Sequence, residues 1–224
     1  MFLVCLGRLI FMKTTIYIVR HGQSIGNEMG LYLGRTDMDL TDKGRQQAQY
    51  AADYLKDIEF DAIYSSPLMR AHNTALPHAK LRGMEIIDRD DLMEIFIGDW
   101  EGIPTDTLKI KYHDEFFYGW TDNYFSFTCP GGESVPECGK RFRAELERIA
   151  KDHVGKNVLV VAHGGVIRAF WGSMMNLDPS VAAKQIPFPS NASYSIVAYD
   201  DGAFLPVIYS CDDHIPPEEK TFIS

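Results

Sequence analysis

The chain has 224 residues, of which 46% are hydrophobic and 24% are charged, and its formal net charge is −9. This composition is typical of a globular protein with a hydrophobic core, and the length suits one medium-sized domain. An acidic surface does not attract nucleic acids or anionic membranes, so we expect neither as a partner. The net charge does not argue against a small phosphorylated metabolite, because such a ligand responds to the local charge of a cleft.

Two features of the chain bear on its cellular compartment and on where its domain begins. The four cysteines are scattered and form no C-x-x-C pair, which predicts neither a disulfide framework nor a zinc site and favours the reducing cytoplasm. Residues 1–12 are apolar, but they lack a basic n-region and a cleavage site and are too short to span a bilayer. We interpret residues 1–12 as an N-terminal extension or a mis-assigned start, followed by a single domain over residues 13–224.

The first part of the chain alternates short apolar runs with a helical pattern. Residues 15–19 (TIYIV) form a β-rich apolar run that is too short for a helix, which predicts a buried strand. Residues 60–64 predict a second strand. Between them, Thr41 can cap a helix whose apolar positions recur at intervals of three and four residues up to Leu55.

The middle of the chain is expected to carry a helix, a strand and an insertion. Ser66-Pro67 should open the helix, with Ser66 as its cap, and Pro77 should end or kink it. A third strand follows at residues 84–87. Residues 94–132 are irregular and rich in aromatic side chains. We interpret them as a helical insertion that closes over a site, although we expect most of the aromatics to pack in the core.

The last part of the chain returns to alternating elements. Ser134 is expected to begin an amphipathic helix. A fourth buried strand, residues 157–162, runs directly into His163 and a helix through Met175. Two final strands, at residues 193–199 and 203–209, flank the hairpin signal Asp201-Gly202.

Strands that alternate with helices predict an α/β fold. We expect a three-layer α/β/α sandwich with a mainly parallel central sheet and helices on both faces. In such sheets, ligands bind at the carboxyl ends of the strands. Five side chains that can perform chemistry follow predicted strand ends: Arg20, His21, Arg70, Glu94 and His163. We therefore expect these five side chains to meet in one site.

This set of side chains can act on a phosphate group. Two guanidiniums match the charge of a phosphate dianion, and a neutral imidazole can attack phosphorus to form a covalent intermediate. A carboxylic acid can protonate the leaving oxygen and later activate water. The glycines after both histidines allow close backbone approach, and helix N-termini offer free N–H groups to an anion. Because these side chains can both position the phosphoryl group and stabilise its negative charge, we expect no metal and no other cofactor.

Six motifs stand in order along the chain. They are Arg20-His21-Gly22-Gln23-Ser24 with Asn27, Gly34-Arg35-Thr36-Asp37, Tyr64-Ser65-Ser66-Pro67 with Arg70, Leu92-Met93-Glu94, Pro130-Gly131-Gly132-Glu133-Ser134, and Val161-Ala162-His163-Gly164-Gly165. With these motifs the chain resembles the histidine phosphatase superfamily, the phosphoglycerate-mutase-like group, over nearly all of residues 13–210.

The resemblance implies roles for the matching residues. His21 would carry the phosphoryl group, Glu94 would give a proton to the leaving group, and His163 would be cationic. Asp99 and Glu101 belong to a part of the motif that looks structural. The residues expected to bind the phosphate or the substrate are Arg20, Asn27, Gly34, Arg70, His163 and Gly164.

We favour a phosphatase that hydrolyses small-molecule phosphomonoesters through phosphohistidine. A phosphoglycerate mutase, which would use 2,3-bisphosphoglycerate, is an alternative that needs more basic residues than Lys109 and Lys111 supply in the insertion. A non-catalytic relative that only binds a phosphate ligand would lack the nucleophile or an arginine, and all are present. Fructose-bisphosphate, α-ribazole phosphate and broad-specificity phosphatases stay open, and the aromatic insertion suits an organic leaving group with an apolar part. We expect a monomer or a homodimer.

Overall fold

The structure is a computed structural model that describes residues 13–175 and 177–221. The expected N-terminal extension, residues 1–12, lies outside the described residues. The assignment of a single domain to residues 13–224 stays a prediction.

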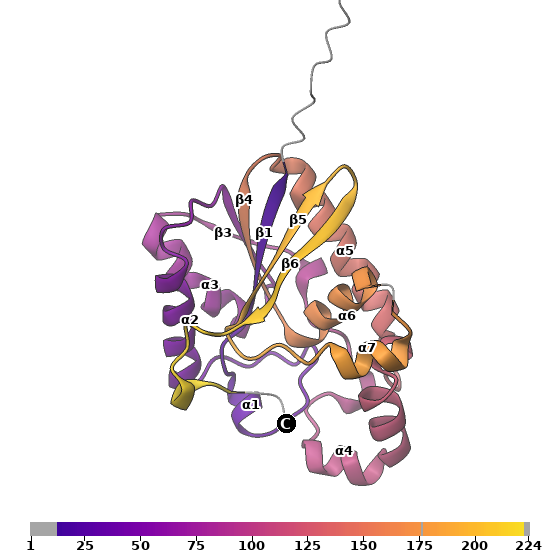
Figure 1. Cartoon of the computed structure of the whole chain (residues 1–224). Coiled ribbons are helices and arrows are strands. Elements are labelled where there is room, and N and C mark those ends of the chain that lie inside the picture. The colour runs from indigo at the N-terminus through magenta and orange to yellow at the C-terminus, as the bar shows by residue number, and fades with distance from the viewer. Residues whose placement is uncertain (1–12, 176, 222–224) are drawn as a thin grey trace, which may run out of the picture.

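Six strands form one sheet in the order β3-β2-β4-β1-β5-β6 (Figure 1). The strands are β1 (Thr14–Arg20), β2 (Ala62–Ser65), β3 (Ile86–Asp88), β4 (Asn157–Ala162), β5 (Tyr194–Asp200) and β6 (Ala203–Cys211). The first four are parallel, whereas β5 pairs antiparallel with both β1 and β6. Asp201 and Gly202 join β5 to β6 with φ of 45° and 80°, as a tight hairpin turn requires. The expected mainly parallel sheet is confirmed.

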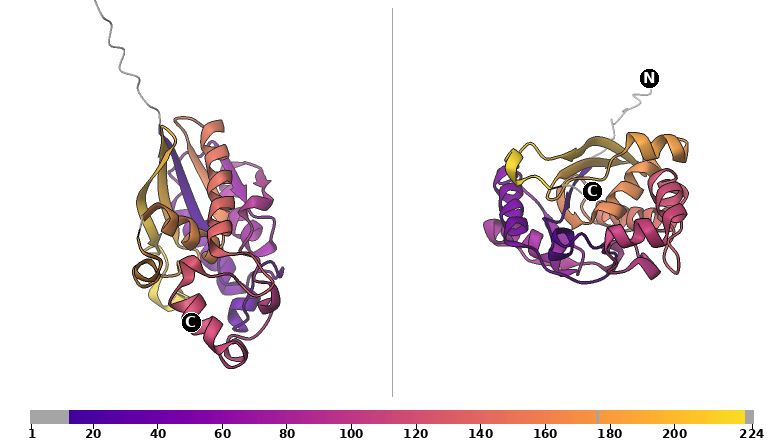
Figure 2. Two further views of the ribbon diagram at one scale, coloured as in Figure 1. Left: turned by 90° about the vertical axis from the view of Figure 1, so that its right-hand side faces the viewer. Right: turned by 90° about the horizontal axis from the view of Figure 1, so that it is seen from below.

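Helices cover both faces of the sheet (Figures 1 and 2). They are α1 (Ile25–Glu28), α2 (Asp42–Tyr54), α3 (Met69–Arg82), α4 (Thr105–Lys111), α5 (Val135–Asp152), α6 (Gly164–Met175) and α7 (Pro179–Gln185). Alternate strand residues point to opposite faces, so the sheet has two cores. Val160 packs with Phe142 of α5 and Phe170 of α6, whereas its neighbour Val161 packs with Ala75 of α3. The expected three-layer arrangement is confirmed.

Two expectations about where α3 begins and ends are wrong, whereas a kink at Pro77 stays a prediction. Ser66-Pro67 does not open the helix, because Leu68 occupies the cap position and α3 begins at Met69. Pro77 lies inside α3, which continues to Arg82 and ends at Gly83 in the left-handed conformation. An interior proline costs a helix roughly 3 kcal/mol relative to alanine. The buried face of α3, which includes Ala75 and Ala79, offsets that cost by packing against the sheet.

The aromatic insertion is helical, as expected. It contains α4, a π-helical turn at Glu115–Thr121 and a 3-10 turn at Tyr124–Ser126. Many of its rings are buried in an aromatic cluster with Trp100. The insertion and α1 lie at the end of the sheet where the parallel strands finish (Figure 1). None of the helices formed by the described residues has the length and apolar character that a membrane crossing requires.

Candidate active site

The register of the sheet brings the two site histidines together. Arg20 at the end of β1 pairs with Ala162 at the end of the parallel strand β4. His21 and His163 are the next residues, and their ring centroids lie 5.2 Å apart. Both side chains are buried. The local cause is the identical direction and register of two buried strands, which end at the same level.

The ring of His21 is held in one tautomer. Its Nδ1 lies 2.7 Å from the carbonyl oxygen of Gly22, which can only accept a hydrogen bond. Nδ1 therefore carries the hydrogen, and Nε2 keeps a free lone pair. Burial, followed by the charges of Arg70 and Arg20, lowers the pKa of His21 well below its ordinary value. The ring is neutral at pH 7, which is the state that a nucleophile requires.

His163 does not have the charge that we expected. Its Nε2 lies 2.8 Å from Oγ of Ser66, and its Nδ1 is buried without a partner. Burial, followed by the charge of Arg70, lowers the pKa of His163 well below its ordinary value. The expected cationic His163 is therefore corrected to a neutral ring. When Nε2 accepts the hydroxyl hydrogen of Ser66, Nδ1–H is a donor for an anion.

Two buried arginines supply the positive charge. Arg20 is 1% exposed and its Nε has no partner, while its Nη1 donates to the carbonyl of Pro189. Burial lowers the pKa of Arg20 to about 10, so the side chain stays charged at neutral pH. Arg70 is the second residue of α3 and donates to the carbonyls of Gly34 and Thr36 at 2.7 and 2.9 Å. These bonds anchor one edge of its guanidinium.

Glu94 lies against the N-terminus of α6. Its two carboxylate oxygens accept hydrogen bonds from the backbone N–H groups of Ile95, Gly165 and Val166 at 2.8–2.9 Å. The N–H groups of Gly165 and Val166 are therefore occupied by Glu94, rather than free for a phosphate as we expected of helix N-termini. Burial raises the pKa of Glu94 in spite of these three bonds. A raised pKa is what a proton donor needs.

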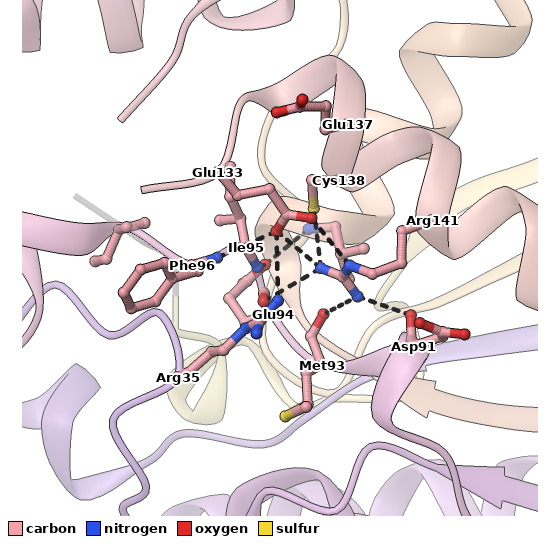
Figure 3. Close-up of polar contacts among 12 residues, drawn as sticks. Arg35, Asp91, Met93, Glu94, Ile95, Phe96, Glu133, Glu137, Cys138 and Arg141 are labelled. Atoms are coloured by element: carbon pink, nitrogen blue, oxygen red, sulfur yellow. Dashed lines mark hydrogen bonds and ion pairs between the residues drawn. The ribbon is translucent and has the colours of Figure 1, made fainter. Parts of the chain in front are cut away.

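Arg141 of α5 holds the segment that carries Glu94 (Figure 3). Its guanidinium donates to the backbone carbonyls of Asp91, Met93 and Glu94 at 2.8, 3.0 and 3.4 Å. Its other edge makes two bonds of 3.0 Å to the carboxylate of Glu133. Every edge of the guanidinium is thus used, and Glu133 fixes the orientation of Arg141.

Glu101 has the structural role that its motif suggested. Its carboxylate accepts hydrogen bonds from the backbone N–H groups of Arg35 and Thr36 at 2.7 and 2.9 Å, and from the hydroxyl of Thr36 at 2.6 Å. The loop of residues 34–36 also supplies the two backbone carbonyls that anchor Arg70. A Cβ on Gly34 would lie 2.2 Å from Oε1 of Glu101, so the packing of the loop requires glycine there.

Most of the predicted site residues line one pocket with an empty volume of about 740 Å³: Arg20, His21, Asn27, Arg70 and Glu94. His163 adjoins the pocket through His21. Gly164 lies close to Arg20, because a Cβ added to Gly164 would be 3.2 Å from Nε of Arg20. The carbonyl of Gly34 accepts a hydrogen bond from Arg70. Whether Gly34, Gly164 and Asn27 touch a bound phosphate stays a prediction. The described residues contain no cluster of three or more histidine, cysteine or carboxylate side chains suited to a metal ion.

Sequence reasoning did not identify several residues that complete this pocket. Phe188 and Trp120 form part of its wall. Trp120 belongs to the aromatic run of the insertion, but nothing separates it there from its buried neighbours. Phe188 and Asn191 carry no local signal, because they reach the site only through the chain between α7 and β5. The amide of Asn191 donates to the carbonyl of His21 at 3.1 Å.

Comparisons with known proteins identify the family of this chain. The sequence model of the histidine phosphatase superfamily (branch 1) matches residues 16–212. Phosphoserine phosphatase 1 of Hydrogenobacter thermophilus is 34% identical over 187 residues, which are 83% of this chain and 87% of that protein. A 2,3-bisphosphoglycerate-dependent phosphoglycerate mutase of Bartonella henselae is 29% identical over 95% of this chain and all of that protein.

A solved structure has the same architecture. YhfR of Bacillus stearothermophilus superposes with a TM-score of 0.81 at 28% identity, covering 90% of this chain and 98% of that chain. The family match and the phosphatase-named relative bear out the expected family and the expected phosphomonoester hydrolase. The chain belongs to the histidine phosphatase superfamily.

Proposed function

We propose that the chain hydrolyses small phosphorylated metabolites through a phosphohistidine at His21. The observation that carries the proposal is the neutral ring of His21, with Nε2 free, in one pocket with two charged guanidiniums and a carboxyl group of raised pKa. This combination offers a nucleophile, a binding site for a dianion and a proton donor.

The reaction has two steps. Nε2 of His21 attacks phosphorus as the ester P–O bond breaks, and Glu94 gives its proton to the leaving oxygen. Arg20 and Arg70, with N–H of His163, stabilise the charge on the phosphoryl oxygens. Water then attacks the phosphohistidine, Glu94 takes a proton from that water, and phosphate leaves His21.

The charge of the pocket supports hydrolysis over the mutase alternative. Among the described residues that line the pocket, Arg20 and Arg70 are the cationic ones. Neither lysine of the insertion lines the pocket. Lys109 pairs with Asp106, and Lys111 lies over the ring of Tyr112. A mutase must also hold a carboxylate and a second phosphate. The non-catalytic alternative is disfavoured because each reacting group is in place.

The proposal includes three further parts. Turnover is independent of metal ions, because two guanidiniums supply the charge that a metal would provide. The protein acts in the cytoplasm, in keeping with the free thiols of Cys129, Cys138 and Cys211. It works as a monomer or a homodimer.

Trapping the phosphoenzyme tests the proposal. The protein is mixed with a ³²P-labelled phosphomonoester and quenched in alkali, in which phosphohistidine survives. We expect label on the wild type and on His72→Ala, a control at a partly exposed histidine, and none on His21→Ala. Label that persists in His21→Ala, or hydrolysis that proceeds without any label, would refute the proposal.

A further inference from the structure

The part of the pocket beyond the reacting groups is mainly apolar. The side chains that form this part are Leu31, Tyr32, Leu33, Ile97, Trp120 and Phe188. Asn27 and Thr105 add neutral polar groups. We call this region the leaving-group wall, because the ester oxygen of a substrate bound at His21 must point away from the phosphate oxygens.

The side chains that line the leaving-group wall carry no positive charge. Both cationic residues among the described pocket residues, Arg20 and Arg70, belong to the phosphate end. A carboxylate or a second phosphate on the leaving group would therefore be removed from water without a cationic side chain in direct contact, which is unfavourable. An uncharged leaving group avoids this penalty.

The wall also contains two aromatic rings that are already ordered. The rings of Trp120 and Phe188 stack with centroids 5.9 Å apart and planes at 25°. Behind them, the guanidinium of Arg168 lies 4.4 Å from the centroid of Phe188. Arg168 is itself fixed by hydrogen bonds to the carbonyls of Ile186 and Ala183 at 2.7 and 2.8 Å. An aromatic surface held in this way binds a flat apolar group with little loss of side-chain freedom.

On the basis of the proposed phosphatase activity, we propose that the substrate is a monoester whose leaving group is uncharged and carries a flat apolar part. Trp120 and Phe188 are then specificity-determining residues. Phosphoserine and phosphoglycerate, whose leaving groups bear charge, are poor substrates of this chain, although a relative is named as a phosphoserine phosphatase.

Three alkyl phosphates test the inference without a large change in the chemistry of the leaving oxygen. They are 3-phenylpropyl phosphate, propyl phosphate and phosphoserine, compared by kcat/KM. We expect the phenyl compound to exceed propyl phosphate by about tenfold or more, and phosphoserine to lie below propyl phosphate. Trp120→Leu and Phe188→Leu, which keep apolar volume but remove the flat ring, should lose about tenfold on the phenyl compound and under about threefold on propyl phosphate.

Tyr118→Leu is the matched control, because Tyr118 is an aromatic residue of the same insertion that is 62% exposed. It should leave all three values unchanged. A wild type that prefers phosphoserine, or variants that lose activity equally on both neutral substrates, would overturn the inference. If labelled His21 forms and the preference is wrong, only the inference fails. If no substrate is hydrolysed and no label forms, the proposed function itself fails.

Discussion

Replacing Arg141 with methionine should weaken proton donation by Glu94 without removing any group that touches the substrate. Arg141 joins the carbonyls of Asp91, Met93 and Glu94 to the carboxylate of Glu133 (Figure 3). Methionine keeps much of the apolar stem but removes every donor. The segment that carries Glu94 then keeps the ion pairs of Arg148 with Asp91 and of Arg89 with Glu145 as its charged links to α5 among the described residues, but it loses the hydrogen bonds to its backbone carbonyls.

The expected loss of activity in Arg141→Met depends on the hydrogen bonds that Glu94 keeps. The Glu94 carboxylate still bonds to the N–H groups of Gly165 and Val166, so its displacement is limited. A misplacement of about 1 Å costs roughly a hundredfold in rate. We therefore expect kcat/KM on propyl phosphate, which reports the step in which Glu94 is the acid, to fall by about tenfold to a hundredfold. Loss of charge-assisted hydrogen bonds should also lower the free energy of unfolding by about 1–3 kcal/mol.

The assay separates positioning from general damage. The alkoxide of propyl phosphate needs a proton when it leaves, whereas the phenolate of p-nitrophenyl phosphate does not. In kcat/KM, which excludes the later hydrolysis of phosphohistidine, Arg141→Met should therefore lose under about threefold on p-nitrophenyl phosphate, since proton donation supplies the larger effect on the alkyl ester. Arg143→Met, which removes a half-buried arginine paired with Glu147 on the same helix, is the control and should change neither rate. Equal losses on the two substrates would refute the role of Arg141 in positioning the acid.

Four further predictions follow from the site and from α3. The raised pKa of Glu94 and the lowered pKa of His21 keep the acid protonated and the nucleophile neutral at mildly acidic pH. kcat/KM on propyl phosphate should thus fall as pH rises through the pKa of Glu94, and a pH profile of Glu94→Gln should lack that descending limb. EDTA should leave the initial rate unchanged, and a loss that Mg²⁺ or Zn²⁺ restores would contradict metal-independent turnover. Glu101→Gln should raise KM more than it lowers kcat, because the loop that anchors Arg70 loosens; steady-state kinetics with an unchanged KM would contradict this. Pro77→Ala should raise the free energy of unfolding by about 2 kcal/mol, since it removes a helix cost of roughly 3 kcal/mol and gives up about 1 kcal/mol of unfolded-state entropy, and urea unfolding measures it.

The strands of this fold could be predicted because they are short, buried and strongly apolar. TIYIV and NVLVVA are too short and too apolar for an amphipathic helix, which favours buried strands. The side chains that follow these parallel strands lie at the same edge of the sheet. The sequence therefore predicts that His21 and His163 lie together, and in the structure their ring centroids are 5.2 Å apart. The same logic located Arg70 and Glu94.

Local signals were insufficient where long-range packing decides the outcome. Pro77 is a helix breaker by its covalent structure, yet α3 passes through it because the buried alanine face of the helix packs on the sheet. The motif around His163 suggested a cation, but burial beside Arg70 makes its ring neutral.

The alternation of strands and helices and the candidate reacting groups can be predicted from the amino-acid sequence alone, because both depend on local pattern and on chemistry that each side chain carries with it. Only the tertiary structure decided the wall of the pocket, the support of Glu94 by Arg141 and the protonation of His163. Those properties arise between residues that are far apart in the chain, and they depend on burial and distance, which no local pattern encodes.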